Sequence, residues 1–252
     1  MIELTIEGPI ATATLCRPPV NAINDEWVAR FDEVLEEVER ADSVAVLCIR
    51  SSQKVFCAGA DLAMMRNILA SAEGRARMIA LTRRMQEVFE RIETLPKTTI
   101  AVIAGPALGG GFELALACDL RIVAENARVG LPEAALGLLP AGGGTQRMTR
   151  ICGEAVARRL ILGAETLSGT DAVKLGLAQW GVAAGELEAF ARSTTTRIAA
   201  LPPRALAECK ACIDISAKGG ADGYETELAG SGALLAMPET LARVARFLEG
   251  QR

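Results

Sequence analysis

Two uninterrupted apolar runs of strand length constrain this chain more than any other feature. Residues 44–49 read VAVLCI, and residues 99–104 read TIAVIA. Runs this short and apolar are typical of strands buried on both faces, as in a parallel sheet covered by helices. Between them, residues 63–93 are rich in Ala, Met, Arg and Glu, which predicts a helix. The alternation of strand and helix predicts an α/β fold built in layers.

Weaker patterns supply the other expected elements. Short strands are predicted at residues 2–6, 11–16, 120–124 and 127–130. Asn24 or Asp25 is expected to cap a helix over residues 25–38, whose apolar face comprises Trp27, Val28, Phe31, Val34, Leu35 and Val38. Beyond residue 153 the patterns are mainly helical, at 155–162, 170–177, 186–200, 205–218 and 238–250, and the glycines at 230 and 232 predict a break. We therefore expect an α/β core at 1–200 and a helical region at 201–252, which packs on the core and on neighbouring subunits.

Composition removes several classes of function. The chain has no histidine, which excludes Ser-His and Cys-His triads and any metal site built on imidazole. A net charge of −4 and an aromatic content of 4% argue against nucleic-acid binding. The seven cysteines are scattered, mostly in apolar runs, as expected of reduced thiols in a cytoplasmic protein. Cys209 and Cys212 form a C-x-x-C, which we interpret as two helix cysteines one turn apart. No signal peptide or membrane-length apolar run is recognised.

A glycine cluster follows the second apolar run. Residues 109–111 are all glycine, and a helix is expected over residues 112–117. Free N–H groups at the start of a helix face an anion or a developing oxyanion. Glu113, in the first turn, either caps the helix or reaches a ligand. The cluster is not a P-loop, because Phe112 and Glu113 stand where Lys and Ser/Thr are required, and Leu114 breaks the dinucleotide-binding pattern.

Two further segments carry candidate chemistry. Residues 57–61 read CAGAD and follow the first apolar run. A backbone N–H presented there, opposite that of Gly110, would complete an oxyanion hole, whereas the alternative is a tight turn with Asp61 as a helix cap. Glu133 follows Pro132 in an otherwise apolar stretch. Its carboxyl group is either exposed on a turn or buried with a raised pKa, as an acid or base.

Taken in order, these segments resemble the enoyl-CoA hydratase/isomerase (crotonase) superfamily over nearly the whole chain. Further similar elements are RPPVNA at 17–22, GGGTQR at 142–147 and ARFLE at 245–249. The resemblance implies a crotonase-like ββα superhelix with a C-terminal helical trimerisation region, assembled as a homotrimer or homohexamer. It also implies an acyl-CoA thioester as substrate, with no metal and no cofactor besides the coenzyme A that the substrate carries.

The same resemblance implies roles for individual residues. The thioester carbonyl would lie between the N–H groups of Ala60 and Gly110, while Glu113 activates a water and Glu133 delivers the α-proton. The presence of both glutamates favours a hydratase, a lyase that adds water to a 2-trans-enoyl-CoA, as in the β-oxidation of fatty acids. Candidate contacts to coenzyme A are Ala58, Asp61, Leu62, Lys54 and Arg17. Two departures from the family pattern are the absence of a lysine from the early element and Ala141 where Pro-Gly is usual.

Two alternatives remain open. A Δ3,Δ2-enoyl-CoA isomerase of the same superfamily would use mainly Glu133. A non-catalytic member of the fold would serve as a binding module, but the two intact glutamates argue against it. The arginine-rich stretch from Arg75 to Arg84 alternates with glutamates, which favours a solvated mixed-charge face over an RNA-binding one. The acyl group and the pathway are not encoded in any pattern that we recognise.

Overall fold

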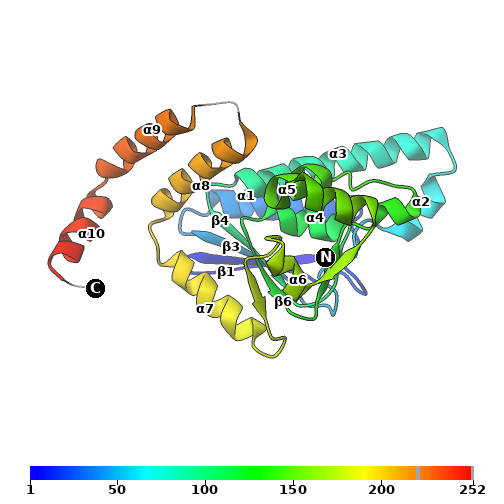
Figure 1. Ribbon diagram of the computed structural model, residues 1–252, viewed down its shortest axis with the longest axis horizontal. Helices are drawn as coiled ribbons and strands as arrows, with labels where there is room; N and C mark the ends of the chain where they lie inside the picture. The colour runs from blue at the N-terminus through cyan, green and yellow to red at the C-terminus, as the bar shows by residue number, and fades with distance from the viewer. Residues whose placement is uncertain (220–221, 251–252) are drawn as a thin grey trace. The chain divides into compact units, whose positions relative to one another are not determined.

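The computed structural model describes residues 1–219 and 222–250 (Figure 1). The chain divides into two compact units, Met1–Ala200 and Leu201–Arg252. The first unit is an α/β structure, and the described part of the second contains helices.

A six-stranded sheet forms the centre of the first unit. Its order is β1-β2-β3-β4-β6-β9; β1 and β2 are antiparallel, and the later neighbours are parallel. The strands are β1 (Ile2–Glu7), β2 (Ile10–Leu15), β3 (Val46–Ser51), β4 (Thr98–Ile103), β6 (Leu120–Ala124) and β9 (Trp180–Val182). The two apolar runs form the adjacent strands β3 and β4, and nearly all of their residues are buried. The prediction of buried parallel strands is confirmed.

Helices cover both faces of this sheet (Figure 1). On one side, α1 (Asp25–Arg40) packs against α3 (Ala72–Thr94). On the other, α7 (Leu187–Ala199) contacts β2, β3 and β6. All six apolar residues predicted to share one face of α1 are buried, and the Asn24 side chain caps the helix by accepting a hydrogen bond from the N–H of Trp27.

A second, three-stranded sheet brings the glycine cluster and Glu133 into position. Its order is β5-β7-β8. The strands and the helices around them are β5 (Ala107–Leu108), α4 (Gly110–Ala117), β7 (Arg128–Gly130), η1 (Glu133–Leu136), α5 (Gly144–Leu162), β8 (Thr166–Ser168) and α6 (Gly169–Lys174). Every residue of α4 is buried, and α4 packs against α3 and α5. A helix with no exposed face is held rigidly, so side chains on it are well placed for chemistry.

One expectation for the first unit is wrong, and two short strands are missing from the sequence-based prediction. Residues 63–93 do not form one helix, because α2 (Leu62–Ile68) ends before α3 begins. Ser71 caps α3 by accepting a hydrogen bond from the N–H of Gly74, and a Cβ on Gly74 would lie only 1.7 Å from the Ile68 carbonyl oxygen. The sequence also gives no sign of β8 and β9, since three-residue strands are too short to show a period.

The second unit contains α8 (Pro203–Lys218), α9 (Gly223–Leu235) and α10 (Pro238–Leu248). The predicted break at residues 230–232 is wrong, since these residues lie inside α9. A Cβ on Gly230 would lie 3.1 Å from Glu208 Oε2 of α8, so this glycine allows the two helices to approach closely. Large apolar side chains that are more than half exposed are Ile213, Leu228, Leu235, Leu241, Val244, Phe247 and Leu248.

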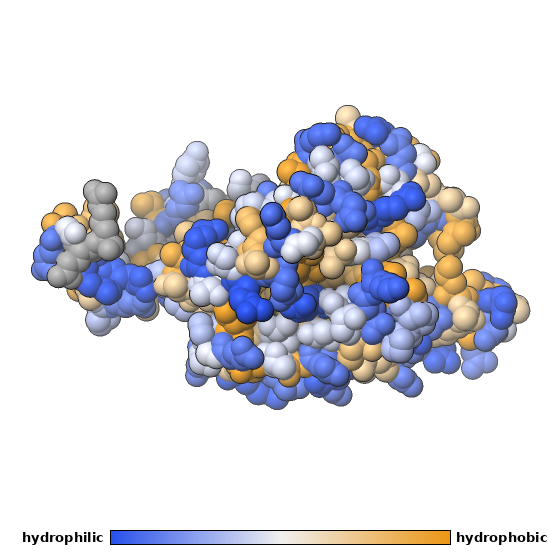
Figure 2. Space-filling view, turned by 90° about the horizontal axis from the view of Figure 1, so that it is seen from below, coloured by the Kyte–Doolittle hydropathy of each residue, from blue (hydrophilic) through white to orange (hydrophobic). Residues whose placement is uncertain are grey.

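The surface mixes charged and apolar groups. Hydrophilic and hydrophobic residues are interspersed over the face drawn in Figure 2. In the arginine-rich stretch of α3, Arg77 and Arg84 both pair with Asp25 of α1, at 2.9 and 3.2 Å. These two arginines therefore belong to a mixed-charge face, as predicted. Among the described residues, no helix is both long and apolar enough to cross a membrane.

Candidate active site

Three segments far apart in the sequence lie side by side. Cys57 forms a parallel bridge with Ala107, and β5 pairs with β7. The N–H of Gly109 then donates to the carbonyl of Gly130 at 3.0 Å. These pairings align residues 57–61, 107–113 and 129–133. The structure thereby brings together the predicted groups on Ala60, Gly110, Glu113 and Glu133.

The backbones at Ala60 and Gly110 are neighbours. A Cβ placed on Gly110 would lie 3.8 Å from the nitrogen of Ala60, and one on Gly59 would lie 3.0 Å from the nitrogen of Gly110. Gly59 has φ +90, a conformation that favours glycine. Gly110 is the first residue of α4, so its N–H has no partner in the helical ladder. Two backbone donors side by side can stabilise one oxyanion.

Glu113 lies in a cradle of glycines. Its side chain is buried, and Oε1 accepts a hydrogen bond from the N–H of Gly144 at 2.7 Å. A Cβ on Gly142 would lie 2.6 Å from Oε2, and one on Gly144 would lie 2.8 Å from Oε1. The glycines at these positions therefore leave room for the carboxyl group, which is not a solvent-exposed helix cap.

Burial raises the pKa of Glu113 to about 7. Hydrogen bonds from the N–H groups of Gly144 and Gly142 oppose that shift, as does the positive charge of Arg147, whereas the nearby charge of Glu133 adds to it. Near neutral pH the group therefore exchanges a proton readily, which suits a general acid or base.

Glu133 begins η1, directly after β7 and Pro132. Its Oε2 is buried and has no hydrogen-bond partner among the described residues, and burial raises the pKa of the carboxyl group. Oε1 lies 3.0 Å from where a Cβ on Gly109 would stand, and Gly109 has φ +54. The residue is half-buried on its turn, so the interpretation that fits the carboxyl group is the one with a raised pKa, and the burial concerns Oε2. A buried, unpartnered oxygen is a group poised to meet a ligand.

Of the candidate coenzyme A contacts, Asp61 and Leu62 lie at the start of α2, and Arg17 reaches Asp61. Arg17 pairs with Asp61 at 2.9 Å and also donates to the carbonyl of Ala22. Asp61 caps α2 by accepting a hydrogen bond from the N–H of Met64, and this bond, followed by the pair with Arg17, lowers the pKa of Asp61. The remaining candidates are exposed: Lys54, Ala58 and Leu62. Asp61 is therefore a helix cap as well as a candidate contact, and much of the Arg17 guanidinium is already engaged.

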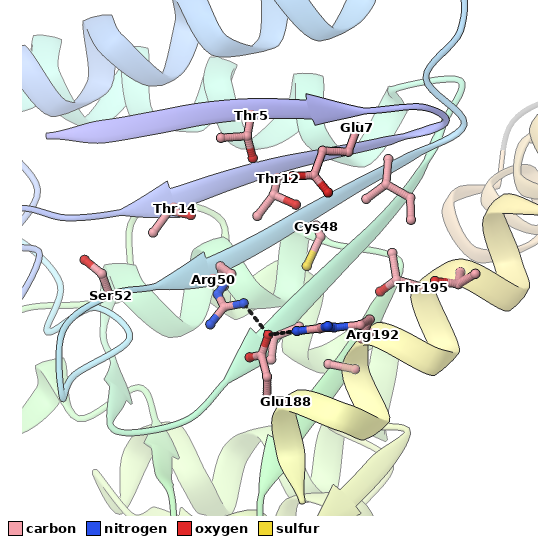
Figure 3. A pocket seen from close by; sticks show the side chains of 14 residues that line it. Thr5, Glu7, Thr12, Thr14, Cys48, Arg50, Ser52, Glu188, Arg192 and Thr195 are labelled. Carbon is pink, nitrogen blue, oxygen red and sulfur yellow. Dashed lines mark hydrogen bonds and ion pairs between the residues drawn. The ribbon is translucent and has the colours of Figure 1, made fainter.

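A separate groove of about 710 Å³ lies between the outer face of β1–β4 and α7 (Figure 3). Hydroxyl groups line it, and three of its charged residues form ion pairs: Glu188 meets Arg50 at 2.7 Å and Arg192 at 3.8 Å. Burial raises the pKa of the Cys48 thiol in this groove to about 11, so the thiolate is scarce at neutral pH. None of the predicted site residues lines the groove.

Comparisons with known proteins identify the family of the chain. The family model described as "Enoyl-CoA hydratase/isomerase" matches residues 5–226. The short-chain-enoyl-CoA hydratase of Clostridium acetobutylicum is 37% identical over 215 residues, which are 84% of this chain and 80% of that protein. The probable enoyl-CoA hydratase of Bacillus subtilis is 38% identical over 208 residues, 82% of this chain and 79% of that protein.

The crystal structure of an enoyl-CoA hydratase from Bacillus anthracis superposes with a TM-score of 0.91 at 29% identity. The superposition covers 99% of this chain and 96% of that one. The fold class inferred from the three segments is therefore confirmed. The chain has the crotonase fold and belongs to the enoyl-CoA hydratase/isomerase family.

Proposed function

We propose that this enzyme is a lyase that hydrates a 2-trans-enoyl-CoA to a 3-hydroxyacyl-CoA. The observation that carries the proposal is the pair of carboxyl groups of Glu113, which is buried, and Glu133, whose Oε2 is buried. Both have raised pKa values and lie near the N–H groups of Ala60 and Gly110. The names of the two relatives above support the same reaction class.

In the proposed mechanism, the thioester carbonyl oxygen accepts hydrogen bonds from the N–H groups of Ala60 and Gly110. Glu113 takes a proton from a water, whose oxygen bonds to C3 as the C2–C3 π electrons move toward the carbonyl. The resulting enolate is held by the two N–H donors, one of which typically contributes about 3–4 kcal/mol in other enzymes. Glu133 gives its proton to C2, so that one water is added in total. Coenzyme A is part of the substrate, and the reaction needs no other cofactor.

The hydrogen bonds of the two carboxyl groups support this division of roles. Burial raises the pKa of both groups, to about 7 for Glu113, so both suit acid–base chemistry. Two backbone N–H groups also donate to Glu113 and favour its charged form, as a base requires. Oε2 of Glu133 has no hydrogen-bond partner among the described residues, which favours the role of acid for Glu133.

The proposed substrate also needs contacts to its coenzyme A part. Ala58, Asp61, Leu62, Lys54 and Arg17 are the residues that we assign to it. Lys54 is exposed and free to approach a phosphate, whereas Arg17 would have to share its guanidinium with Asp61. Phosphate is a strong acceptor for both side chains.

We further propose a homotrimer or homohexamer in a cytoplasmic location. The support for assembly is the exposed apolar surface of α10, where Leu241, Phe247 and Leu248 are each more than 60% exposed. Apolar area of this kind is usually covered by a partner. The support for the location is the presence of seven free cysteines among the described residues.

The test is turnover of crotonyl-CoA, which is monitored as the loss of absorbance of the conjugated thioester. We expect turnover by the wild type, and a loss of roughly 10²–10⁴-fold in Glu113→Gln and in Glu133→Gln. Glu90→Gln is a matched control, because Glu90 is an exposed residue of α3 outside the site, and it should keep the wild-type rate.

Retention of hydration by Glu113→Gln would contradict the mechanism. A wild type inactive on crotonyl-CoA and on a panel of larger 2-enoyl-CoA thioesters would contradict the reaction itself. Turnover of a 3-enoyl-CoA that depends on Glu133 but not on Glu113 would assign the chain to the isomerases instead.

A further inference from the structure

Arg147 hydrogen-bonds to the glycine turn at residues 142–144 that surrounds the Glu113 carboxyl group. Arg147 lies in the first turn of α5, and its side chain is 8% exposed. Its Nη1 donates to the carbonyl of Gly142 at 2.9 Å. A Cβ on Gly143 would lie 2.3 Å from the same nitrogen, so the guanidinium packs directly on the turn. Gly143 has φ +102, which a residue with a side chain adopts only under strain.

The other side of the guanidinium is fixed to α3. Nε and Nη2 of Arg147 both approach Oε2 of Glu93, at 2.9 and 2.8 Å. The second oxygen of Glu93 accepts a hydrogen bond from Arg150 at 2.9 Å. A forked arrangement of this kind orients a guanidinium as well as pairing its charge. The turn at residues 142–144 is thereby tied to a long helix that contacts α4.

We propose that Arg147 is a positioning residue for Glu113: it holds the carbonyl of Gly142 and so fixes the glycine turn whose N–H groups meet the carboxylate. This inference rests on the proposed function, because it assigns a part in that reaction. Arg147 does not touch the substrate; it acts through the turn and through its charge.

The charge of Arg147 reaches Glu113 as well. The charged groups facing Glu113 are Glu133 from η1 and Arg147 from α5. From α3 the nearby side chain is the apolar Met85, and β5 consists of Ala107 and Leu108. Arg147 lowers the pKa of Glu113 and Glu133 raises it. Removal of the arginine charge therefore favours the protonated form of Glu113, which cannot act as a base.

The test compares Arg147→Met, Arg147→Lys and Glu93→Gln, with Arg150→Met as a matched control that leaves the contact to Gly142 in place. For Arg147→Met we expect kcat to fall roughly 10–100-fold, since a small displacement of a catalytic group has effects of this size. KM should change little, and the acid limb of kcat/KM should move to higher pH. Arg147→Lys and Glu93→Gln keep the positive charge at residue 147 but loosen its hold on the turn. We therefore expect kcat to fall, while the acid limb stays near its wild-type position. Arg150→Met should resemble the wild type in both.

A readout that needs no turnover accompanies the kinetics. Carbon-13 NMR of labelled glutamate carboxyl groups, with the Glu113 signal assigned from Glu113→Gln, gives the pKa of Glu113 in each variant. We expect a higher pKa in Arg147→Met and a nearly unchanged one in Arg147→Lys. The NMR measurement tests the role of Arg147 even if the wild type hydrates none of the thioesters. That lack of hydration would contradict the proposed function alone.

Three results would overturn the inference. The first is a folded Arg147→Met with wild-type kcat and an unshifted acid limb. The second is an unchanged Glu113 signal in that variant. If Arg147→Met does not fold, the third is wild-type kcat in both Arg147→Lys and Glu93→Gln, because each of these disturbs the grip on Gly142.

Discussion

A methyl group added at Gly142 would collide with Glu113. The Cβ of Gly142→Ala would lie 2.6 Å from Glu113 Oε2 and 2.6 Å from Met85 Cε. Ordinary contacts begin at 3.4 Å, so relieving the clash on the Glu113 side needs a shift of about 0.8 Å. Met85 Cε is the end of a flexible side chain and can yield, whereas Glu113 is held on a fully buried helix. The strain therefore acts on the carboxylate and on the turn that cradles it.

The size of the effect follows from this displacement. A misplacement of roughly 1 Å costs on the order of 100-fold in rate, and overpacking of a core typically costs about 1–3 kcal/mol of stability. We expect Gly142→Ala to lower kcat for crotonyl-CoA on the order of 100-fold. It should also lower the free energy of unfolding, measured in urea, by about 1–3 kcal/mol. Gly185→Ala is the matched control, because nothing lies within 4 Å of its Cβ.

A double variant separates the two effects. In a Glu113→Gln background, Gly142→Ala should still destabilise the protein but should reduce the residual rate no further, because both changes act on the same group. Wild-type kcat in folded Gly142→Ala would refute the reasoning, and so would losses of rate that multiply in the double variant.

Two further predictions concern pH and assembly. The raised pKa means that folded Glu113 keeps a proton that the unfolded chain releases above about pH 4.5. The contribution of this group to the free energy of unfolding is therefore fully present below pH 4.5 and is lost as the pH rises to about 7. Glu113→Gln should therefore gain Tm over the wild type progressively from pH 5 to 7, and a pH-independent difference would contradict this. Leu241→Asp combined with Phe247→Asp should reduce the mass in light scattering to that of a monomer, whereas Glu239→Gln on the same helix should not; an unchanged mass would exclude α10 from the interface.

Local composition is enough to find some of these elements. The runs that form β3 and β4 have the pattern of strands buried on both faces, and the period of α1 marks its buried face. Glu113 and Glu133 stand out because each is a carboxyl group in apolar or glycine-rich surroundings. Each of these patterns is contained in a few neighbouring residues, so it can be recognised in the sequence without knowledge of the fold.

Other features depend on residues that are distant in the sequence. Nothing near Arg17 indicates that its guanidinium pairs with Asp61, 44 residues away. The break between α2 and α3 arises from Ser71 and from the close approach of Gly74 to Ile68, neither of which interrupts the helical composition of the stretch. The close packing of α8 and α9 at Gly230 likewise depends on Glu208.

The glycines at 142–144 show where sequence interpretation loses information. A run of glycines before a helix predicts a flexible start, and α5 does begin at Gly144. The absence of side chains has a second consequence that appears only once their neighbours are known: Glu113 occupies the space at Gly142 and Gly144, and Arg147 occupies it at Gly143. Alanine at any of the three would keep a plausible helix start and would disturb either the carboxylate or the guanidinium that steadies it. The turn is therefore better understood as part of the Glu113 site than as a helix cap, and its tolerance to substitution should follow catalysis more closely than helix propensity.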